Sequence, residues 1–441
     1  MHTDPTNFED SQSEGTLTEG LVSLIRNKPI AKVDLDVMAL FTLDGIANML
    51  AGRRTIPGQK LLAYLKGRKA DAGRRALVMG GLTHILEVDD LHKASVLHPA
   101  CVTIPAALAL AGDQRPLGID FLTAVLYGFE ACSRVGMSVG QTHYKVWHNT
   151  STCGTFGGAM TAATMLGLTD VETVHALGNA GTQSAGLWEF LNTGAMSKHL
   201  HAGRAAEAGI LAADLAKLGF TGPPAILEGP QGLYAGACPD PDPEAVLRDP
   251  DARWQVHQTS IKPWPSCRHT HPVIDAALEL SDKIDVNQIE RVDVAIYQAS
   301  IDVCDRPEPE TEYEAKFSLQ HCVGISLLDG KCGFASFNPS GRERAAKLRR
   351  RVSVRASNSY SDAYPKDWGG EVTVNLRNGS SVNAVRTACK GDPEYPLGRE
   401  EMMVKARDLL AFGGVNDVEG VIGSIIGLAD GGKLFEYDLF D

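Results

Sequence analysis

Residues 239–251 read PDPDPEAVLRDPD, and this stretch rich in proline and aspartate divides the chain into two parts of different pattern. Proline disfavours helix interiors and central strands, so such a run is typical of a boundary between domains. Before it the apolar residues recur with a helical period, and after it strand patterns appear. We therefore predict two domains, which the length of 441 residues also favours.

The part before this boundary, from 31 to 236, has a helical pattern almost throughout. Apolar side chains recur on one helical face over 119–139. Residues 154–167 (GTFGGAMTAATMLG) are mostly small, which predicts close contact between helices, since glycine by itself disfavours a helix. A further helix is expected over 203–219, with Gly219 as its C-terminal cap.

The part after the boundary mixes strands and helices. Residues 291–296 alternate apolar and polar side chains, and 371–382 (EVTVNLRNGSSV) contain an Asn-Gly pair typical of a hairpin turn. Helices are expected at 272–283 and 315–328, and again in the C-terminal tail, which we expect to pack on the first domain.

The predicted fold is therefore mainly α. It has a flexible N-terminus over 1–20, a large all-α domain over 21–255, a smaller α+β domain over 256–394, and C-terminal helices over 395–441 that return to the all-α domain.

Composition narrows the possible partners and location. The formal net charge of −12 argues against nucleic acid or an anionic membrane as main partner, because both require a basic face. No run of about 18 apolar residues appears, and the acidic, polar N-terminus lacks the pattern of a signal peptide. Nine scattered cysteines without a CxxC pair indicate free thiols. We predict a cytoplasmic protein that binds neither nucleic acid nor membrane.

The common nucleotide, zinc-protease and hydrolase motifs are absent from the sequence, which argues against those activities. Titratable residues concentrate instead in four short segments. The first, 87–99 (EVDDLHKASVLHP), holds Asp89, Asp90, His92 and His98. These groups are suited to acid–base chemistry or metal binding, although no third histidine recurs at ligand spacing. The alternative is an acidic loop that caps the next helix.

The second segment, 144–154 (YKVWHNTSTCG), is a polar turn that runs into the small-residue helix. Free N–H groups at a helix N-terminus suit a carboxylate, and His148 could act as acid or base beside it. The alternative is that the hydroxyl and amide side chains only cap the helix.

The third segment, 197–204 (SKHLHAGR), is expected just before a helix and gathers Lys198, His201 and Arg204. If these cations were on an exposed face, they would be ordinary surface residues. Because an alanine-rich buried helix follows them, they indicate an anion-binding site.

The fourth segment, 260–272 (SIKPWPSCRHTHP), lies at the predicted domain junction, where clefts are common. A Pro-Trp-Pro sequence holds Lys262 in place, as catalysis requires. The alternative is a rigid linker. Cys267 and the two histidines that follow it are too close together for most tetrahedral metal sites, so no metal is predicted.

Five ordered motifs together resemble the MmgE/PrpD family. They are DDLHKASVLHP at 89–99, HNTSTCGTFG at 148–157, SKHLHAGRAA at 197–206, GFTGPPAILEGPQG at 219–232 and KPWPSCRHTHP at 262–272. The resemblance spans the chain from about residue 20. It implies an all-α domain with an inserted α+β lid, a homodimer, and action on a di- or tricarboxylate without a metal or other cofactor.

The resemblance also implies a set of site residues. The catalytic positions of the family fall on Asp90, His98, His148, Lys198 and Lys262. Substrate-binding positions are expected among Asp89, His92, Tyr144, His201, Arg204, Cys267 and His321. Three positions depart from the pattern: Glu87 replaces an aspartate of some members, Cys267 stands where the decarboxylase-like pattern has histidine, and His321 stands where many members have tyrosine.

The preferred hypothesis is a lyase that dehydrates a hydroxy-tricarboxylate similar to 2-methylcitrate. His148 or Asp90 would remove the proton from carbon, the two lysines would bind carboxylates and stabilise the enolate-like charge, and His98 or His321 would protonate the departing hydroxyl. The alternatives are an epimerase of iminodisuccinate or a related amino-dicarboxylate, a cis-aconitate decarboxylase, and a non-catalytic binding protein.

Overall fold

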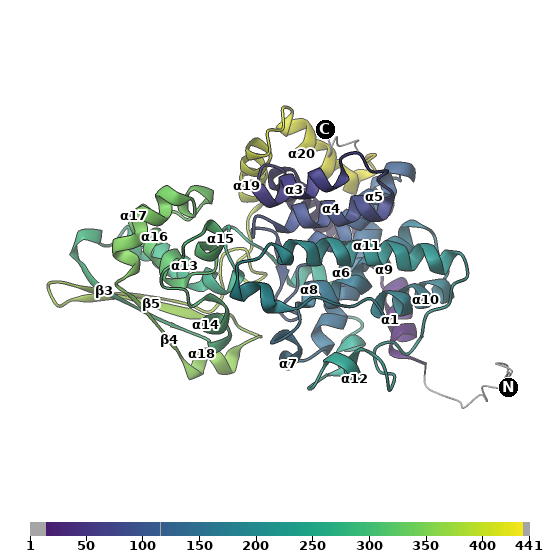
Figure 1. The fold of residues 1–441 in the computed structure, drawn as a ribbon, viewed down its shortest axis with the longest axis horizontal. Coiled ribbons are helices and arrows are strands. Elements are labelled where there is room, and N and C mark those ends of the chain that lie inside the picture. The colour runs from purple at the N-terminus through teal and green to yellow at the C-terminus, as the bar shows by residue number, and fades with distance from the viewer. Residues whose placement is uncertain (1–14, 115, 435–441) are drawn as a thin grey trace.

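The computed structural model describes residues 15–114 and 116–434 and shows two lobes side by side (Figure 1). One lobe is helical and includes both ends of the described chain, and the other combines a sheet with helices. Residues 1–14 of the predicted flexible N-terminus lie outside the described residues. That prediction is wrong for residues 17–20, which begin the first helix because Thr16 and Glu19 form a capping box.

The helical lobe consists of helices from the N-terminal part of the chain and two from the C-terminal part. They are α1 (Leu17–Asn27), α2 (Lys32–Gly52), α3 (Ile56–Leu65), α4 (Ala72–His84), α5 (Ala100–Gln114), α6 (Gly118–Ser138), α7 (Gln141–Tyr144), α8 (Asn149–Thr152), α9 (Gly154–Met165), α10 (Asp170–Gly181), α11 (Ser197–Lys217), α12 (Leu233–Ala237), α19 (Arg399–Phe412) and α20 (Val418–Ile426).

Helix α11 lies at the centre of this lobe and packs against α4, α9 and α10. The expected close contact of small residues is confirmed, because a Cβ on Gly209 of α11 would lie 2.3 Å from the carbonyl carbon of Gly158 in α9. Gly219 has a positive φ of 83° just past the C-terminus of α11, as a C-terminal cap requires. The predicted start of this helix at residue 203 is wrong: α11 begins at Ser197, so the cation cluster forms its first two turns.

The C-terminal helices lie on the helical lobe (Figure 1), and α19 packs on α2. Helix α2 is long and apolar enough to cross a membrane, but 83% of its most apolar window is buried inside the protein, as in the core helix of a soluble protein. Its buried face contributes to the largest hydrophobic cluster.

The second lobe is built on a four-stranded sheet in the order β4 (Val352–Ala356), β3 (Ile289–Ile296), β5 (Gly370–Leu376), β6 (Ser381–Arg386). Strands β3 and β4 are parallel and the other pairs antiparallel. The predicted hairpin is confirmed, with Gly379 at a φ of 83° in its turn. The helices of this lobe are α13 (His271–Ser281), α14 (Gln298–Cys304), α15 (Glu312–Lys316), α16 (Leu319–Asp329), α17 (Pro339–Arg349) and α18 (Asn358–Ala363).

The helix expected at 315–328 is interrupted in the structure. Helix α15 ends at Lys316, and α16 starts at Leu319 because the Ser318 side chain caps it by accepting from the N–H of His321. Helices α13 and α16 pack against each other, and α13 also packs on β5 and β6. The resulting core of the second lobe is separate from that of the helical lobe.

A small two-stranded sheet connects the two parts of the chain. Strand β1 (Asp90–His92) pairs antiparallel with β2 (Thr259–Ile261), and Asp90 faces Ile261. Because residue 262 follows Ile261, this register places it beside residue 89. Lys262 is thereby fixed to the helical lobe by backbone hydrogen bonds.

Candidate active site

The centre of the candidate site is a buried group of two lysines and two carboxylates. Lys262 Nζ lies 3.3 Å from Asp89 Oδ1, as the strand register requires, and 3.8 Å from Glu87 Oε2. Lys198 Nζ, from the first turn of α11, donates to both carboxylate oxygens of Glu87 at 2.5 and 2.6 Å. All four side chains are almost fully buried. The structure thus brings together three segments that are up to 175 residues apart (87 to 262).

Glu87 is in an unusual backbone conformation. Its φ is 61°, in the left-handed region that costs a non-glycine residue about 1–2 kcal/mol. Val96, which lies across the same loop, has a φ of 49°. Such strain often occurs at functional sites, where the surrounding structure holds it in place.

The ion pairs set the charges of these groups. Burial alone would raise the pKa of Glu87, but the ammonium groups of Lys198 and Lys262 lower it to about 2. Burial is likewise outweighed at Asp89, where His84 and Lys262 hold the pKa well below its usual range. Glu87 in turn raises the pKa of Lys198 against the effect of burial. The sequence analysis expected the lysines to be available for a substrate carboxylate. In the structure they are paired with carboxylates of the protein itself.

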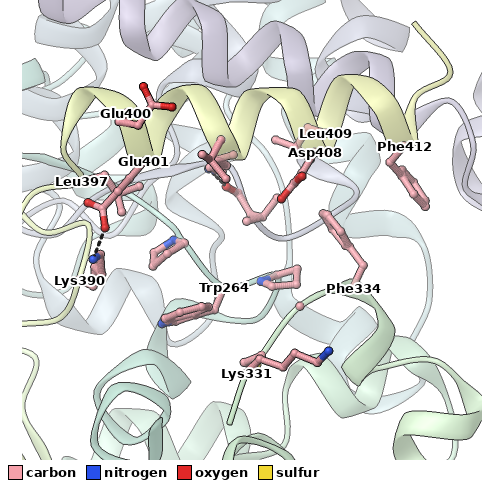
Figure 2. A pocket seen from close by; sticks show the side chains of 17 residues that line it. Trp264, Lys331, Phe334, Lys390, Leu397, Glu400, Glu401, Asp408, Leu409 and Phe412 are labelled. Carbon is pink, nitrogen blue, oxygen red and sulfur yellow. Dashed lines mark hydrogen bonds and ion pairs between the residues drawn. The ribbon is translucent and has the colours of Figure 1, made fainter. Parts of the chain in front are cut away.

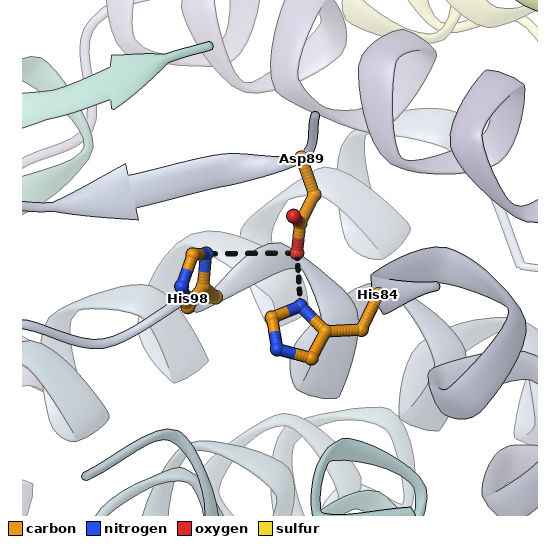
Figure 3. Close-up of side chains that lie close together, drawn as sticks. All are labelled: His84, Asp89 and His98. Atoms are coloured by element: carbon orange, nitrogen blue, oxygen red, sulfur yellow. Dashed lines mark hydrogen bonds and ion pairs between the residues drawn. The ribbon is translucent and has the colours of Figure 1, made fainter. Parts of the chain in front are cut away.

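Two histidines contact the Asp89 carboxylate (Figure 3). His84, the last residue of α4, donates from Nδ1 to Asp89 Oδ2 at 2.6 Å, and His98 Nδ1 lies 3.6 Å from the same oxygen. His98 Nδ1 also makes a short hydrogen bond to the backbone carbonyl of Asp90. A carbonyl only accepts, so Nδ1 of His98 carries the proton and Nε2 has a free lone pair. Burial lowers the pKa of His98 well below 6.5, which keeps the ring neutral.

The side chains of His84, Asp89 and His98 also lie close enough to hold a metal ion, with ligand atoms within 4.8 Å of one another. However, the Nδ1 atoms of the two histidines are both engaged in hydrogen bonds. The Lys262 ammonium, 3.3 Å from Asp89, would repel a cation at this point. The donor set therefore fits a hydrogen-bonded acid–base group better than a metal site.

His148 forms a second layer next to this group. Its Nδ1 lies 3.2 Å from Nδ1 of His201, and its ring stacks on that of His84 with centroids 5.8 Å apart. Trp188 covers the other side at 4.6 Å. The polar residues after His148 do not cap a helix with their side chains: the Asn149 amide donates to the Ser95 carbonyl, and Thr150 accepts from the N–H of His98. They fix the loop that carries His98.

A small cavity lies between this group and the second lobe. Four of the predicted site residues line it: His98, Tyr144, Lys198 and Cys267. Its free volume of about 20 Å³ is enough for about one water molecule. Tyr144 and Trp188 separate it from an open groove of about 790 Å³ between the lobes. The site is thus closed, and these two aromatic side chains lie between it and solvent.

Eight predicted residues do not line this cavity: Asp89, Lys262 and His148, which lie directly behind its wall, and five others. The Asp90 carboxylate accepts from the N–H of Ala100 at the start of α5, so the capping alternative is correct for this residue. Burial and the neighbouring charge of Asp89 raise the pKa of Asp90 well above its usual range, which makes it unsuitable as the base. His92 bonds to Ser95 and Gln255, and His201 lies behind His148.

The remaining two, Arg204 and His321, are placed away from the site. Arg204 lies on the exposed face of α11 and pairs with Glu207, because its position on the helix points away from Lys198. His321 Nε2 bonds to the Ser336 carbonyl at 2.9 Å inside the second lobe, since the late start of α16 turns it towards Phe337. Neither residue is in place to contact a substrate, so both predictions are corrected.

The structure adds residues that the sequence analysis did not single out. From the helical lobe these are His84 and Trp188. His84 lies outside the quoted motifs, and only its burial in the structure marks it as a site residue. From the second lobe Arg268, His269, Phe317 and Trp368 line the cavity. Arg268 and His269 lie within a quoted motif, but nothing in their spacing showed that they would face the cavity while His271 would not.

A larger cavity of about 710 Å³ lies elsewhere between α19 and the second lobe (Figure 2). It is mostly apolar, with Trp264, Phe334 and Phe412 in its walls. None of its lining residues is a histidine, and its Lys390 is paired with Glu401. Its wall includes Val88 and Pro263, which are the sequence neighbours of the charged residues of the buried group. Its volume far exceeds that of the small cavity, but the acid–base groups are at the small one.

Comparisons with known proteins agree with the two-lobed arrangement of these residues. The family model of the MmgE/PrpD N-terminal domain matches residues 25–246, and that of the MmgE/PrpD C-terminal domain matches residues 264–421. The chain belongs to the MmgE/PrpD family.

Relatives of this MmgE/PrpD protein carry the name cis-aconitate decarboxylase. The enzyme of Aspergillus terreus is 26% identical over 91% of this chain and 89% of its own length. The human enzyme is 28% identical over 75% of this chain and 71% of its own length. These similarities support an enzyme, while the reaction of this chain is a separate question.

The buried histidines predict a loss of stability in acid. Burial lowers the pKa of His92 and His321 to about 4, and that of His199 and His269 to about 3. Below pH 6.5 the unfolded chain binds protons that the folded chain does not. Each histidine therefore lowers the free energy of unfolding, by up to about 1.4 kcal/mol per pH unit, as the pH falls towards 4.

Urea denaturation at pH 8, 7, 6 and 5 would measure this effect. We expect little change from these groups between pH 8 and 7, and a loss of several kcal/mol between pH 6.5 and 5. A free energy of unfolding that is constant down to pH 5 would contradict the neutral, buried state of these histidines.

Proposed function

We propose that the protein is a lyase that removes water from a small hydroxy-polycarboxylate similar to 2-methylcitrate, without a redox cofactor. The observation that carries this proposal is the state of His98. Its Nδ1 proton is held by the Asp90 carbonyl, so the neutral Nε2 can only accept a proton. A base at the cavity wall suits a reaction that begins with removal of a proton from carbon.

Lys198 and Lys262 would bind the substrate through N–H donors that are not used by Glu87 and Asp89. An ammonium group has three N–H donors, and Lys198 uses two of them on Glu87. Lys262 Nζ is buried and has no well-aligned hydrogen bond within the described chain. A substrate carboxylate next to the reacting carbon would accept these donors. As that carboxylate gains enolate-like charge, the same donors stabilise it more strongly.

In the proposed dehydration, each bond that breaks is matched by one that forms. The C–H bond breaks and its proton moves to Nε2 of His98. The electron pair forms the new C=C bond, and the C–O bond on the adjacent carbon breaks. The hydroxyl leaves as water with a proton from the Lys198 ammonium, and proton return from His98 to that lysine through solvent restores the site.

Substrate entry requires the closed cavity to open. A tricarboxylate is several times larger than the space for about one water that it offers. We propose that Tyr144 and Trp188 move apart to join the cavity to the adjacent groove, which both side chains also line. Because β1 and β2 fix Lys262 to the helical lobe, a movement of the second lobe would displace Arg268 and His269 but not Lys262.

The second candidate is decarboxylation of cis-aconitate, which the names of the relatives favour. That reaction breaks a C–C bond, releases carbon dioxide and places a proton on carbon. His98 Nε2 carries no proton in the state described, so Lys198 would have to deliver this proton and the base on His98 would have no role. Epimerisation of an amino-dicarboxylate such as iminodisuccinate would use the same first step as dehydration. A homodimer, which the family resemblance implies, stays a prediction.

One experiment separates these reactions. The purified protein is incubated in deuterated water, with and without chelator, with 2-methylcitrate, cis-aconitate or iminodisuccinate. A conjugated product absorbing in the near ultraviolet would support dehydration. Carbon dioxide release would support decarboxylation, and deuterium at a stereocentre without a new alkene would support epimerisation. Loss of all activity with chelator would contradict the proposed metal-independent chemistry.

A further inference from the structure

His269 is held rigidly in the wall that the second lobe contributes to the cavity. It belongs to the short helical turn Arg268–Thr270, directly before α13. Its ring stacks on Trp368, with centroids 4.7 Å apart and planes only 8° from parallel. Its Nδ1 forms a hydrogen bond of 2.8 Å with the Tyr297 hydroxyl. With 2% of its surface exposed, the imidazole has one fixed position.

The other ring nitrogen of His269 has no partner. Nε2 is buried and without a hydrogen bond in the described part of the chain, although the residue lines the cavity. Leaving a buried polar group unsatisfied costs about 1–3 kcal/mol. A buried nitrogen without a partner in a cavity wall indicates that a ligand atom satisfies it.

The hydrogen bond to Tyr297 determines which nitrogen carries the proton. In the described chain the Tyr297 hydroxyl has no other hydrogen-bond partner than His269 Nδ1. Burial holds the pKa of Tyr297 well above its usual range, so the phenol keeps its proton. Donation to Nδ1 is the arrangement that gives this buried proton an acceptor in the described chain. Nδ1 then accepts, and the proton of the neutral ring is on Nε2, directed to the cavity.

We propose that His269 is a substrate-binding residue whose Nε2–H donates to a carboxylate oxygen of the polycarboxylate, opposite the base His98. This proposal rests on the proposed function, because it names the group that holds the substrate from the second lobe. The Arg268 guanidinium supports an anion here: it is buried, held by Asp392 at 2.5 Å, and lies over the Trp368 ring. His98 thus accepts a proton on one wall, and His269 donates a hydrogen bond from the other.

Two isosteric substitutions separate this role from a structural one. In His269→Gln the amide nitrogen can occupy the place of Nε2, and in His269→Asn it can occupy only the place of Nδ1. Calorimetric titration with tricarballylate, an unreactive tricarboxylate, would measure binding. We expect His269→Asn to weaken binding about 10- to 100-fold, the usual effect of losing a hydrogen bond to a charged group, and His269→Gln to stay within about 3-fold. Melting temperatures would confirm that both variants fold.

Nitrogen-15 NMR of histidine-labelled protein gives a readout that needs no turnover. The His269 signals, assigned by their absence from His269→Asn, should show a protonated Nε2 that shifts when tricarballylate is added. Equal binding by the two variants, or an unprotonated Nε2, would overturn the proposal. If the wild-type protein binds tricarballylate through His269 but converts none of the three substrates, the proposed reaction fails while the binding role stands.

Discussion

Replacement of Lys198 by Met is expected to lower kcat/KM by about 10²–10³-fold, the usual effect of removing one donor from a site of developing negative charge. The change removes the ammonium that is proposed to stabilise the enolate-like charge and to protonate the leaving hydroxyl. It also leaves Glu87 buried, with only Lys262 at 3.8 Å as a cationic neighbour. Removal of one partner of a buried ion pair costs about 3–5 kcal/mol, so lower stability is expected as well.

A double variant separates these two effects of the Lys198 substitution. Glu87→Gln combined with Lys198→Met removes both charges, so much of the lost stability should return while activity should not. Arg204→Ala is the matched control, because Arg204 lies on the exposed face of the same helix. It should have wild-type kcat/KM and a similar melting temperature. Wild-type activity in Lys198→Met, measured with the substrate that the protein converts, would refute the proposed site.

The fold could be predicted largely because its boundaries have local causes. The Asn-Gly turn, the Gly219 cap and the small-residue helix each follow from the conformational preferences of the residues involved. The predictions failed where a polar side chain decided where a helix begins. Thr16 starts α1 inside the segment expected to be flexible, and Ser318 divides the helix expected at 315–328.

The start of α11 at Ser197 was also not predicted, and it affects the site directly. Helical spacing then places Lys198 and Arg204 on different faces, one buried and one exposed, although the sequence grouped them as a single cation cluster. Likewise, the pairing of Lys262 with Asp89 follows from the register of β1 and β2. That register joins residues about 170 positions apart, and no local pattern in the chain could reveal it.

The roles of the site residues were least predictable, because they depend on protonation states that distant contacts determine. His148 and Asp90 are equally plausible bases in the sequence. In the structure Asp90 caps α5 with a raised pKa, and His148 lies behind the cavity wall against His201. His98, predicted as an acid, is instead the base that we propose, because one backbone carbonyl fixes its Nδ1 proton.

Replacement of His98 by Asn is expected to lower kcat by about 10²–10⁴-fold, the range typical of a lost general base, with little change in fold. The Asn amide can still donate to the Asp90 carbonyl in place of Nδ1, but nothing replaces Nε2. The pH profile tests the same assignment in the wild-type protein. Burial lowers the pKa of His98, so activity should not fall between pH 8 and 6.5, and its acid limb should lie below pH 6.5.

Exchange of the substrate C–H proton with deuterated water would show which step is lost in His98→Asn. With His98 as the base, the variant should neither exchange this proton nor form product. His148→Asn is the matched comparison: it alters the second layer but leaves Nε2 of His98 at the cavity, so exchange should persist at a reduced rate. The opposite result, exchange retained in His98→Asn and lost in His148→Asn, would assign the base to His148. It would also mean that the cavity opens on the Trp188 side far enough for a substrate to reach the second layer.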